Sequence, residues 1–476
     1  MSFAKIYTRG LLGLHAPQIE VEVHISSGLP SLTIVGLPEA AVRESKDRVR
    51  SAIINSGFLF PTKRLTINLA PADLPKDGSR LDLPIALGIL IASGQLPENC
   101  TDGFEFIGEL ALDGHLRPVS GTLTIAMACQ QARHRLLLPV GNLDEASQLP
   151  EFEVYAASHL QQVCAHFLGN SLLKAAPQKS MAASSRYPFD LADVKGQLRP
   201  RRALEIAAAG GHSLLFKGPP GTGKTLLASR LPSILPPLNA QENLEVASIY
   251  SVANAQHTFG QRPFRAPHHT ASAIALVGGG SQPKPGEITL AHLGVLFLDE
   301  LPEFDRKVLE VLRQPLESKE IVISRAARQM TFPANFQFIA AMNPCPCGYA
   351  FNQDSRCQCS PESIQRYQNR ISGPLLDRID LHIDVPPLQA NELQERTPSE
   401  NSETVRQRVM KAYQQQIQRQ QCLNQALSPT LLEQYACLDD SSSKIIEMAQ
   451  QRLNLSARAY HRVLRVARTI ADLAES

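Results

Sequence analysis

Runs of apolar residues along the first part of the chain predict short strands that alternate with helices. Residues 19–25 alternate apolar and polar side chains with a period of two, which is the pattern of a half-buried strand. Residues 31–35 and 64–69 have a similar strand-like composition. Residues 39–56 repeat apolar side chains near helical spacing and predict an amphipathic helix. This alternation continues to about residue 165.

Later in the chain the apolar runs become continuous. Residues 213–216, 295–298 and 336–342 are short and almost wholly apolar, as expected of strands buried on both faces of a parallel sheet. Small, polar residues at 174–185 predict a linker before this region. From Glu403 to the end the chain is helical in character, and we interpret the glutamines at 414–416 and 420–421 as a solvated helix face.

Composition fits an ordinary globular protein with ample core, with 43% hydrophobic and 19% charged residues. The net charge is only +2, so any binding of nucleic acid must come from local basic surfaces. The first residues do not combine a basic segment with an apolar core, and the apolar run at 83–96 is too short to span a bilayer and predicts a buried helix. We therefore expect a cytoplasmic protein whose nine cysteines are not in disulfides.

Residues 218–225 read GPPGTGKT and fit the phosphate-loop pattern G-x-x-x-x-G-K-[ST]. An apolar strand precedes the loop and a helical segment follows it, which is the context that the motif needs. The glycines allow successive backbone N–H groups to face a phosphate, while lysine contacts the β- and γ-phosphates and threonine offers a hydroxyl to Mg²⁺. The predicted nucleotide-binding residues are Gly218, Pro219, Pro220, Gly221, Thr222, Gly223, Lys224 and Thr225.

Polar residues follow two of the later buried strands. Asp299 and Glu300 come directly after 295–298, and Asn343 ends the strand that begins at Phe336. Carboxyl ends of parallel strands bind ligands in α/β sheets, so Asp299 is expected to hold Mg²⁺ with Thr225. Glu300 is expected to orient or deprotonate the attacking water, and Asn343 to contact that water or the γ-phosphate.

These motifs together resemble those of the AAA+ ATPases, and several strings resemble the magnesium-chelatase-like branch of that class. The resemblance covers nearly the whole chain. It rests on FRAPHH at 264–269, GGG at 278–280, PKPGE at 283–287, LDELPEF at 298–304, MNPCPCG at 342–348 and LLDRIDLH at 375–382.

The resemblance implies roles for two arginines. Arg378 matches the arginine finger that reaches the γ-phosphate of a neighbouring subunit, and Arg458 matches the sensor-2 arginine of a helical lid. The alternatives are a salt bridge of Arg378 with Asp377 or Asp380, and an ordinary exposed helix position for Arg458. A finger that acts between subunits implies a homo-oligomeric ring, which in this family is a hexamer.

Two segments resemble the hairpins that such rings point into their channel. Residues 321–332 predict strand, basic turn and strand, with Arg325 and Arg328 near the tip, and residues 266–286 carry Lys284. Cationic side chains there would grip phosphates of DNA without reading sequence. The alternative for the two arginines is ordinary salt bridges between subunits. The histidines of FRAPHH are weak evidence for a metal site.

Four cysteines are clustered as two C-x-C pairs: Cys345, Cys347, Cys357 and Cys359. In a reducing compartment such a set favours a metal over a disulfide. Four thiolates satisfy Zn²⁺ tetrahedrally and leave no open position, so the predicted site is structural. The spacing differs from the usual C-x₂₋₄-C, and reduced surface thiols are the alternative.

The first region resembles the proteolytic domain of Lon at residues 69–84 and 107–121. Lon-type peptidases use a serine nucleophile and a lysine base. In this chain Arg80 and Leu123 occupy those two positions, and Ser79 is one position away from the serine. We therefore expect a non-proteolytic domain used for assembly or for binding DNA or a partner.

The expected fold is α/β, with an AAA+ P-loop core, an α-helical lid and a Lon-like α+β domain in front. The expected boundaries are 1–170 for the Lon-like domain, 171–188 for the linker, 189–390 for the core with its cysteine insertion at 345–359, and 391–476 for the lid. The resemblance implies an ATP- and Mg²⁺-dependent DNA motor that promotes branch migration of recombination intermediates in natural transformation. The rival functions are a magnesium-chelatase-type motor, a protein-remodelling ATPase and a Lon-type protease.

Overall fold

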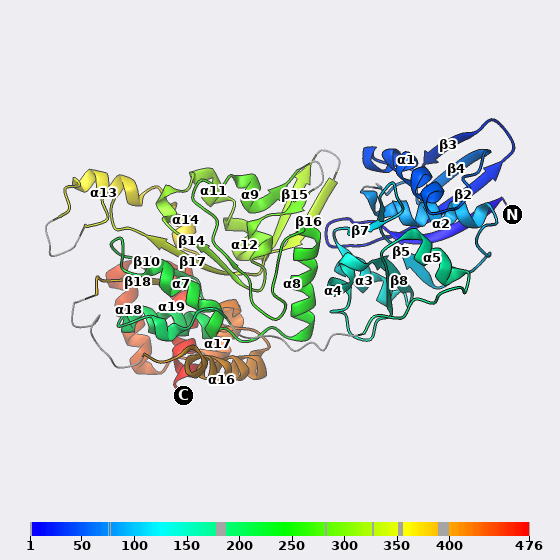
Figure 1. Cartoon of the computed structure of the whole chain (residues 1–476). Coiled ribbons are helices and arrows are strands. Elements are labelled where there is room, and N and C mark those ends of the chain that lie inside the picture. The colour runs from blue at the N-terminus through cyan, green and yellow to red at the C-terminus, as the bar shows by residue number, and fades with distance from the viewer. Residues whose placement is uncertain are drawn as a thin grey trace. The chain divides into compact units, whose positions relative to one another are not determined.

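The computed structural model of the chain divides into two compact units (Figure 1). One comprises Met1–Ala182 with Ala247–His257, and the other comprises Ala183–Val246 with Thr258–Ser476. The structure describes residues 2–74, 76, 78–177, 187–280, 283–325, 328–350, 356–388 and 399–475. Residues 178–186 of the predicted linker lie outside this set.

A mixed sheet forms the centre of the first unit, with strand order β3-β4-β2-β1-β5-β8-β9. Strands β1, β2 and β4 pair antiparallel, whereas β3 is parallel to β4, and β5, β8 and β9 are parallel to one another. The strands are β1 Phe3–Arg9, β2 Gln18–Ser26, β3 Ser31–Val35, β4 Arg64–Ala70, β5 Phe104–Phe106, β8 Arg135–Pro139 and β9 Val154–Ala157. The strands predicted at 19–25, 31–35 and 64–69 are therefore confirmed.

Helices pack on this sheet and complete the core of the first unit. They are α1 Ala40–Asn55, α2 Asp82–Ala92, α3 Thr122–Gln131, α4 Leu143–Ala146 and α5 Leu160–Phe167, with a small hairpin of β6 Glu109–Leu110 and β7 Leu116–Arg117. Helix α2 is buried along its whole length, as predicted for the apolar run that begins at Leu83. It lies so close to β2 that a Cβ on Gly88 would be 2.6 Å from a methyl carbon of Val23, which explains the glycine inside the helix.

The segment Ala247–His257 contributes to the first unit although it follows the phosphate loop in the sequence. It includes the second half of helix α8, Ala240–Ala253. The carbonyl oxygen of Ser251 accepts a 3.1 Å hydrogen bond from the Gly121 amide, and its hydroxyl oxygen lies 3.3 Å from the Leu123 amide. Gly121 is the N-cap of α3 and Leu123 lies in its first turn, where backbone donors lack partners within the helix.

A parallel sheet forms the centre of the second unit, with strand order β11-β14-β17-β10-β18. The strands are β10 Leu214–Lys217, β11 Phe264–Arg265, β14 Val295–Leu298, β17 Gln337–Met342 and β18 Leu381–Asp384. Strands β14 and β17 are buried at every position, which confirms the prediction from their continuous apolar sequences. Because the strands are parallel, the loops after β10, β14 and β17 lie at the same edge of the sheet.

Helices and two small hairpins surround this sheet. The helices are α6 Leu198–Gly210, α7 Lys224–Ile234, α9 Ala273–Val277, α10 Glu287–Leu290, α11 Arg306–Glu310, α12 Arg313–Ser318, α13 Pro361–Gln368 and α14 Gly373–Leu376. The hairpins pair β12 Gly278–Gly279 with β13 Lys284–Pro285, and β15 Glu320–Arg325 with β16 Arg328–Pro333. The predicted hairpin at 321–332 is thus confirmed as a backbone structure.

The C-terminal part of the second unit is helical over α16 Ser402–Gln420, α17 Pro429–Tyr435, α18 Asp440–Leu453 and α19 Ala457–Leu473. The interpretation of the glutamines as a solvated face is wrong for Gln416, which is fully buried. Its amide nitrogen donates a 3.0 Å hydrogen bond to the carbonyl oxygen of Ala209 at the end of α6, so it satisfies a backbone group where the two helices meet. Across the described residues, every helix falls short of the length and apolar character needed to cross a membrane.

Candidate nucleotide-hydrolysis site

The phosphate loop connects β10 to α7 and depends on glycine at several positions. Gly221 and Gly223 have φ values of 77° and 85°, a region that favours glycine. A Cβ on Gly218 would lie 2.3 Å from the carbonyl oxygen of Val385, so only glycine fits against that backbone. The loop therefore has the tight backbone turn that a phosphate cradle requires.

Lys224 is the first residue of α7, and its side chain lies back along the loop. It is 8% exposed, and its Nζ donates to the carbonyl oxygens of Gly218 at 2.7 Å and Pro219 at 2.8 Å. A third bond of 3.2 Å goes to Oδ1 of Asn343, the residue after β17. Burial lowers the pKa of Lys224, while the nearby carboxylates of Asp299 and Glu300 act in the opposite direction. The lysine thus lies between the phosphate loop and the predicted sensor asparagine.

A hydroxyl and a carboxylate meet beside the lysine. Oγ1 of Thr225 donates a 2.5 Å hydrogen bond to Oδ2 of Asp299, the residue that follows β14. Hard oxygen ligands of this type suit Mg²⁺, which is usually held by one or two carboxylates together with substrate phosphates. The chemistry of the donor pair therefore fits the predicted magnesium site.

Glu300 has a backbone conformation that few non-glycine residues adopt, with φ of 52°. Its carboxylate oxygen Oε2 lies 3.3 Å from Nδ1 of His269, which comes four residues after β11. The ring of His269 is tilted by 34° against that of His268, with centroids 4.1 Å apart, and meets the Phe304 ring edge-on at a centroid distance of 6.4 Å. The contact of His269 with Glu300 was not predicted from the sequence, although His269 follows a strand that ends at the same edge of the sheet.

The two predicted arginines meet at a carboxylate that the sequence analysis did not single out. Arg378 donates from Nη2 to Oε1 of Glu317 at 2.6 Å and from Nη1 to the carbonyl oxygen of Pro374 at 2.6 Å. Arg458, in the first turn of α19, approaches the same Oε1 at 3.4 Å. The carboxylate that pairs with Arg378 is thus on α12, whereas Asp380 accepts hydrogen bonds from Ser213.

The side chains of these arginines differ in exposure. Arg378 is 12% exposed and its Nε is buried with no hydrogen-bond partner among the described residues, while Arg458 is 55% exposed. Within the described part of the chain, neither arginine forms a hydrogen bond or ion pair with residues 218–225, Asp299 or Asn343. The candidate site therefore consists of two separate sets of residues, one around Lys224 and one around Glu317.

The four clustered cysteines converge as the sequence predicts. Their sulfur atoms all lie within 4.8 Å of one another, and the closest pairs are 3.3 to 3.8 Å apart. Four sulfurs placed about 2.3 Å from a tetrahedral zinc ion are about 3.8 Å from one another, so the arrangement fits that ion. The backbone N–H of Tyr349 lowers the pKa of the Cys347 thiol to about 6, which favours the thiolate that binds metal.

The predicted DNA-contacting residues lie at the two hairpins. Arg325 and Arg328 pair with each other at the end of β15 and β16 that carries the turn. Their side chains and residues 326–327 lie outside the described parts of the structure. Lys284 is exposed on β13.

The positions predicted to replace a peptidase dyad lie in the first unit. Arg80 is 8% exposed and Leu123 is fully buried. Ser79 donates its hydroxyl to the carboxylate of Glu109. Nη1 of Arg80 lies 3.4 Å from the carbonyl oxygen of Ser120, so the arginine occupies space beside α3.

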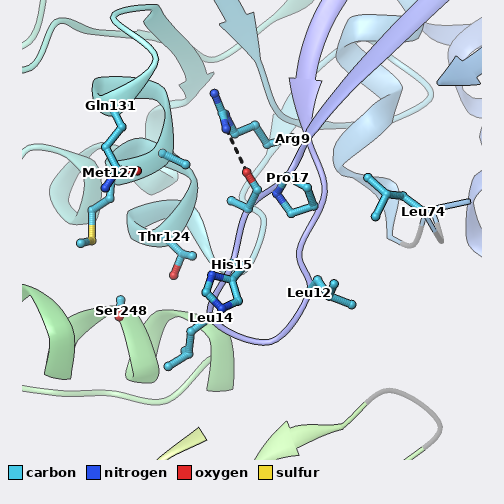
Figure 2. A pocket seen from close by; sticks show the side chains of 12 residues that line it. Arg9, Leu12, Leu14, His15, Pro17, Leu74, Thr124, Met127, Gln131 and Ser248 are labelled. Carbon is cyan, nitrogen blue, oxygen red and sulfur yellow. Dashed lines mark hydrogen bonds between the residues drawn. The ribbon is translucent and has the colours of Figure 1, made fainter. Parts of the chain in front are cut away.

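The first unit also contains a cavity of about 450 Å³ (Figure 2). Arg9 lines it, but its guanidinium is bound to the carboxylate of Glu105 and to the carbonyl oxygen of Ala16. The hydroxyl of Thr124, also in the lining, is buried and has no hydrogen-bond partner among the described residues. The Arg9 guanidinium is thus already paired with a carboxylate and is not free to bind a phosphate in this cavity.

A phosphate loop, an acidic strand end and a polar asparagine on one edge of a parallel sheet define a P-loop nucleotide-binding protein. The profile described as "Magnesium chelatase, subunit ChlI" matches residues 190–393, that of "Subunit ChlI of Mg-chelatase" matches residues 21–142, and that of "Magnesium chelatase, subunit ChlI C-terminal" matches residues 399–476. The chain belongs to the magnesium-chelatase-like family that includes YifB and ComM, which confirms the resemblance drawn from the motifs.

Two full-length relatives are particularly informative. The chain is 50% identical to the competence protein ComM of Haemophilus influenzae over 481 residues, which cover 99% of this chain and 94% of that protein. It is also 50% identical to YifB of Escherichia coli over 480 residues, covering 100% and 94%. The magnesium-chelatase 38 kDa subunit of Cereibacter sphaeroides is 25% identical over 177 residues, which are 33% of this chain and 53% of that subunit.

Proposed function

We propose that this protein is an ATP-driven, ring-forming DNA motor that promotes branch migration of recombination intermediates during natural transformation. The observation that carries the ATPase part is the convergence of Lys224, Thr225, Asp299 and Asn343 on one sheet edge. The similarity to a protein named for competence over almost the full chain supports the DNA-related part.

The residues of the first set have complementary tasks in ATP hydrolysis. Thr225 and Asp299 would hold Mg²⁺, which supplies neutralising charge on the phosphates. Lys224 and Asn343 would bind the γ-phosphate, and Lys224 would exchange its bonds to the loop carbonyls for bonds to phosphate oxygens. Glu300 would accept a proton from the attacking water, with His269 holding its carboxylate.

The set around Glu317 supports a site that is shared between subunits. Arg378 and Arg458 have no phosphate-loop partner within the described residues of their own chain. We infer that both serve the nucleotide of a neighbouring subunit, where Arg378 acts as the finger. A closed ring, proposed to be a hexamer, gives every nucleotide such a neighbour.

DNA would be gripped in the channel of the ring. Arg325 ends β15 and Arg328 begins β16, and β13 carries the exposed Lys284. Lysine and arginine bind the phosphate backbone independently of sequence, as a translocating motor requires. The first unit is proposed to be a Lon-like, non-proteolytic domain for assembly or for binding DNA or a partner, because Arg80 and Leu123 replace the dyad.

The cysteine cluster is proposed to hold a structural Zn²⁺. All four ligand positions would be taken by thiolates, so the ion would have no place for a reacting water. The sulfur separations support this assignment.

The test is ATP hydrolysis with and without DNA, combined with branch migration of a labelled four-way junction. We expect single-stranded or branched DNA to stimulate hydrolysis. We expect branch migration to convert the junction into separate duplexes only with ATP. Glu300→Gln is expected to bind ATP but to lose turnover, and normal hydrolysis by this variant would refute its role as the base.

A magnesium-chelatase-type motor is the second candidate function, supported by the match to the chelatase subunit of Cereibacter sphaeroides. ATP hydrolysis that does not respond to DNA, with no migration of the junction, would favour this function. Protein remodelling would instead be indicated by stimulation with an unfolded protein substrate.

A further inference from the structure

We propose that the metal centre formed by Cys345, Cys347, Cys357 and Cys359 controls nucleotide binding, because the ion fixes the loop that supports the phosphate loop and Asn343. This inference rests on the proposed ATPase function, and it adds a regulatory ligand, Zn²⁺, to the same site. The ion does not touch the nucleotide in this arrangement. It acts through the backbone between Asn343 and Gly348.

The first link is the short stretch of backbone that joins the cysteine cluster to Asn343. Strand β17 ends at Met342, Asn343 follows, and Cys345 is only two residues further on. Cys345 is fully buried, and its sulfur accepts a 3.2 Å hydrogen bond from the Ala350 amide while its carbonyl accepts one of 3.0 Å from Gly348. The cysteine is therefore the fixed inner end of a tight turn that begins at the sensor.

The second contact is between the cysteine loop and the phosphate loop. Gly348 has φ of 86°, and a Cβ built on it would lie 2.6 Å from Cδ of Pro220 and 3.9 Å from Cγ of Asn343. The backbone of the cysteine loop thus lies directly against the phosphate loop and the sensor side chain. Any shift of this loop changes the space available to Pro220.

The third contact ties the other end of the loop to the same place. Ser360, next to Cys359, caps helix α13 by accepting from the Ser363 amide. At the far end of that helix, Nε2 of Gln368 donates a 3.0 Å hydrogen bond to the carbonyl oxygen of Pro344. Zn²⁺ bound by both C-x-C pairs would hold the turn at Cys345 and the start of α13 in fixed positions.

Loss of the ion is expected to release the two C-x-C pairs from each other. Without a cation the sulfurs are held together only by weak S–H···S contacts of 3.3 to 3.8 Å, and binding energy at such a centre is also folding energy for the loops around it. Cys347 is exposed, so the ion can exchange with solvent. The loop on Pro220 and Asn343 would then lose its support, and the nucleotide site would be weakened without any change in its own residues.

The test measures zinc content and nucleotide affinity separately from hydrolysis. We expect one Zn²⁺ per chain, and at least tenfold weaker binding of a fluorescent ATP analogue after chelation, restored by added Zn²⁺. Cys347→Ser is expected to lose both the ion and the affinity. Cys437→Ser is the matched control, since Cys437 is an exposed thiol outside the cluster.

Gly348→Ala disturbs the contact with Pro220 without removing the ion. It therefore tests the inference even if metal-free protein unfolds. Its Cβ would push against Pro220, so this variant is expected to keep one Zn²⁺ yet to bind nucleotide at least tenfold more weakly. Any of three results would overturn the inference. Gly348→Ala could bind nucleotide with wild-type affinity, folded protein could keep its affinity after zinc is removed, or wild-type protein could contain no zinc when purified. A zinc-dependent affinity in a protein that ignores DNA would refute the motor function and leave this inference standing.

Discussion

Replacing Arg378 by alanine tests whether the nucleotide site is completed by a second subunit. The structure sets the scale of the structural loss. Arg378 forms one ion pair with Glu317, whose side chain is 53% exposed, and one bond to the Pro374 carbonyl. Exposed pairs contribute about 0.2–1 kcal/mol, and a hydrogen bond from a charged group about 1.5–3 kcal/mol. The variant should thus lose about 2–4 kcal/mol of stability at most and remain folded.

The expected catalytic loss is larger. An arginine finger contributes about 10³–10⁵ in kcat, which corresponds to about 4–7 kcal/mol of transition-state stabilisation. We therefore expect Arg378→Ala to keep its affinity for a fluorescent ATP analogue and to lose at least about a thousandfold in hydrolysis. Arg202→Ala is the matched control, because Arg202 forms a 2.7 Å ion pair with Glu205 outside the proposed site.

Mixing two inactive variants provides the decisive assay. Arg378→Ala subunits keep Glu300, and Glu300→Gln subunits keep Arg378, so a mixed ring contains some complete sites. Steady-state phosphate release should rise well above that of either variant alone. If the mixture stays inactive, or if Arg378→Ala hydrolyses ATP at the wild-type rate, the reasoning about a shared site is refuted.

Three further predictions concern other parts of the molecule. Arg325→Ala with Arg328→Ala should weaken binding of every DNA sequence and flatten its salt dependence, measured by fluorescence anisotropy at several salt concentrations; an unchanged slope would exclude these arginines. His269→Ala should lower kcat roughly tenfold to a hundredfold with unchanged nucleotide affinity, because Glu300 loses the group that orients it; equal kcat would contradict this. Burial raises the pKa of Asp82 to about 6, so its stabilising contribution is complete below about pH 4 and is lost as pH rises through 6. Urea unfolding should show wild type losing about 3 kcal/mol relative to Asp82→Asn between pH 4 and pH 7, whereas parallel profiles would refute the shift.

Local sequence predicted the set around Lys224 because each of its members is attached to a strand. The glycine pattern identifies the loop, and the continuous apolar runs before Asp299 and Asn343 identify parallel strands whose ends must meet. The cysteine cluster was also predictable, since two C-x-C pairs only nine residues apart can reach one metal ion.

The set around Glu317 could not be predicted in the same way. Glu317, Arg378 and Arg458 come from three elements far apart in the sequence, and an exposed glutamate on a short helix has no distinguishing pattern. The prediction for Gln416 was wrong for a related reason. Its polar neighbours suggest exposure to solvent, whereas the packing of α16 on α6 buries it. Such pairings depend on tertiary packing and leave no periodic signal.

The hydrogen bonds of Ser251 at the N-terminal end of α3 limit how chimeric proteins can be built from related chains. The first unit is not encoded by one uninterrupted stretch, because Ala247–His257 completes it from beyond the phosphate loop. A fragment that stops at residue 182 would lose the acceptor of the Gly121 amide, whereas the Leu123 amide would keep its 3.0 Å hydrogen bond to Oε1 of Glu145. A chimera that takes residues 1–182 from one relative and the remainder from another must therefore also match the short segment around Ser251, and a cut at the linker is not a cut between two self-sufficient folds.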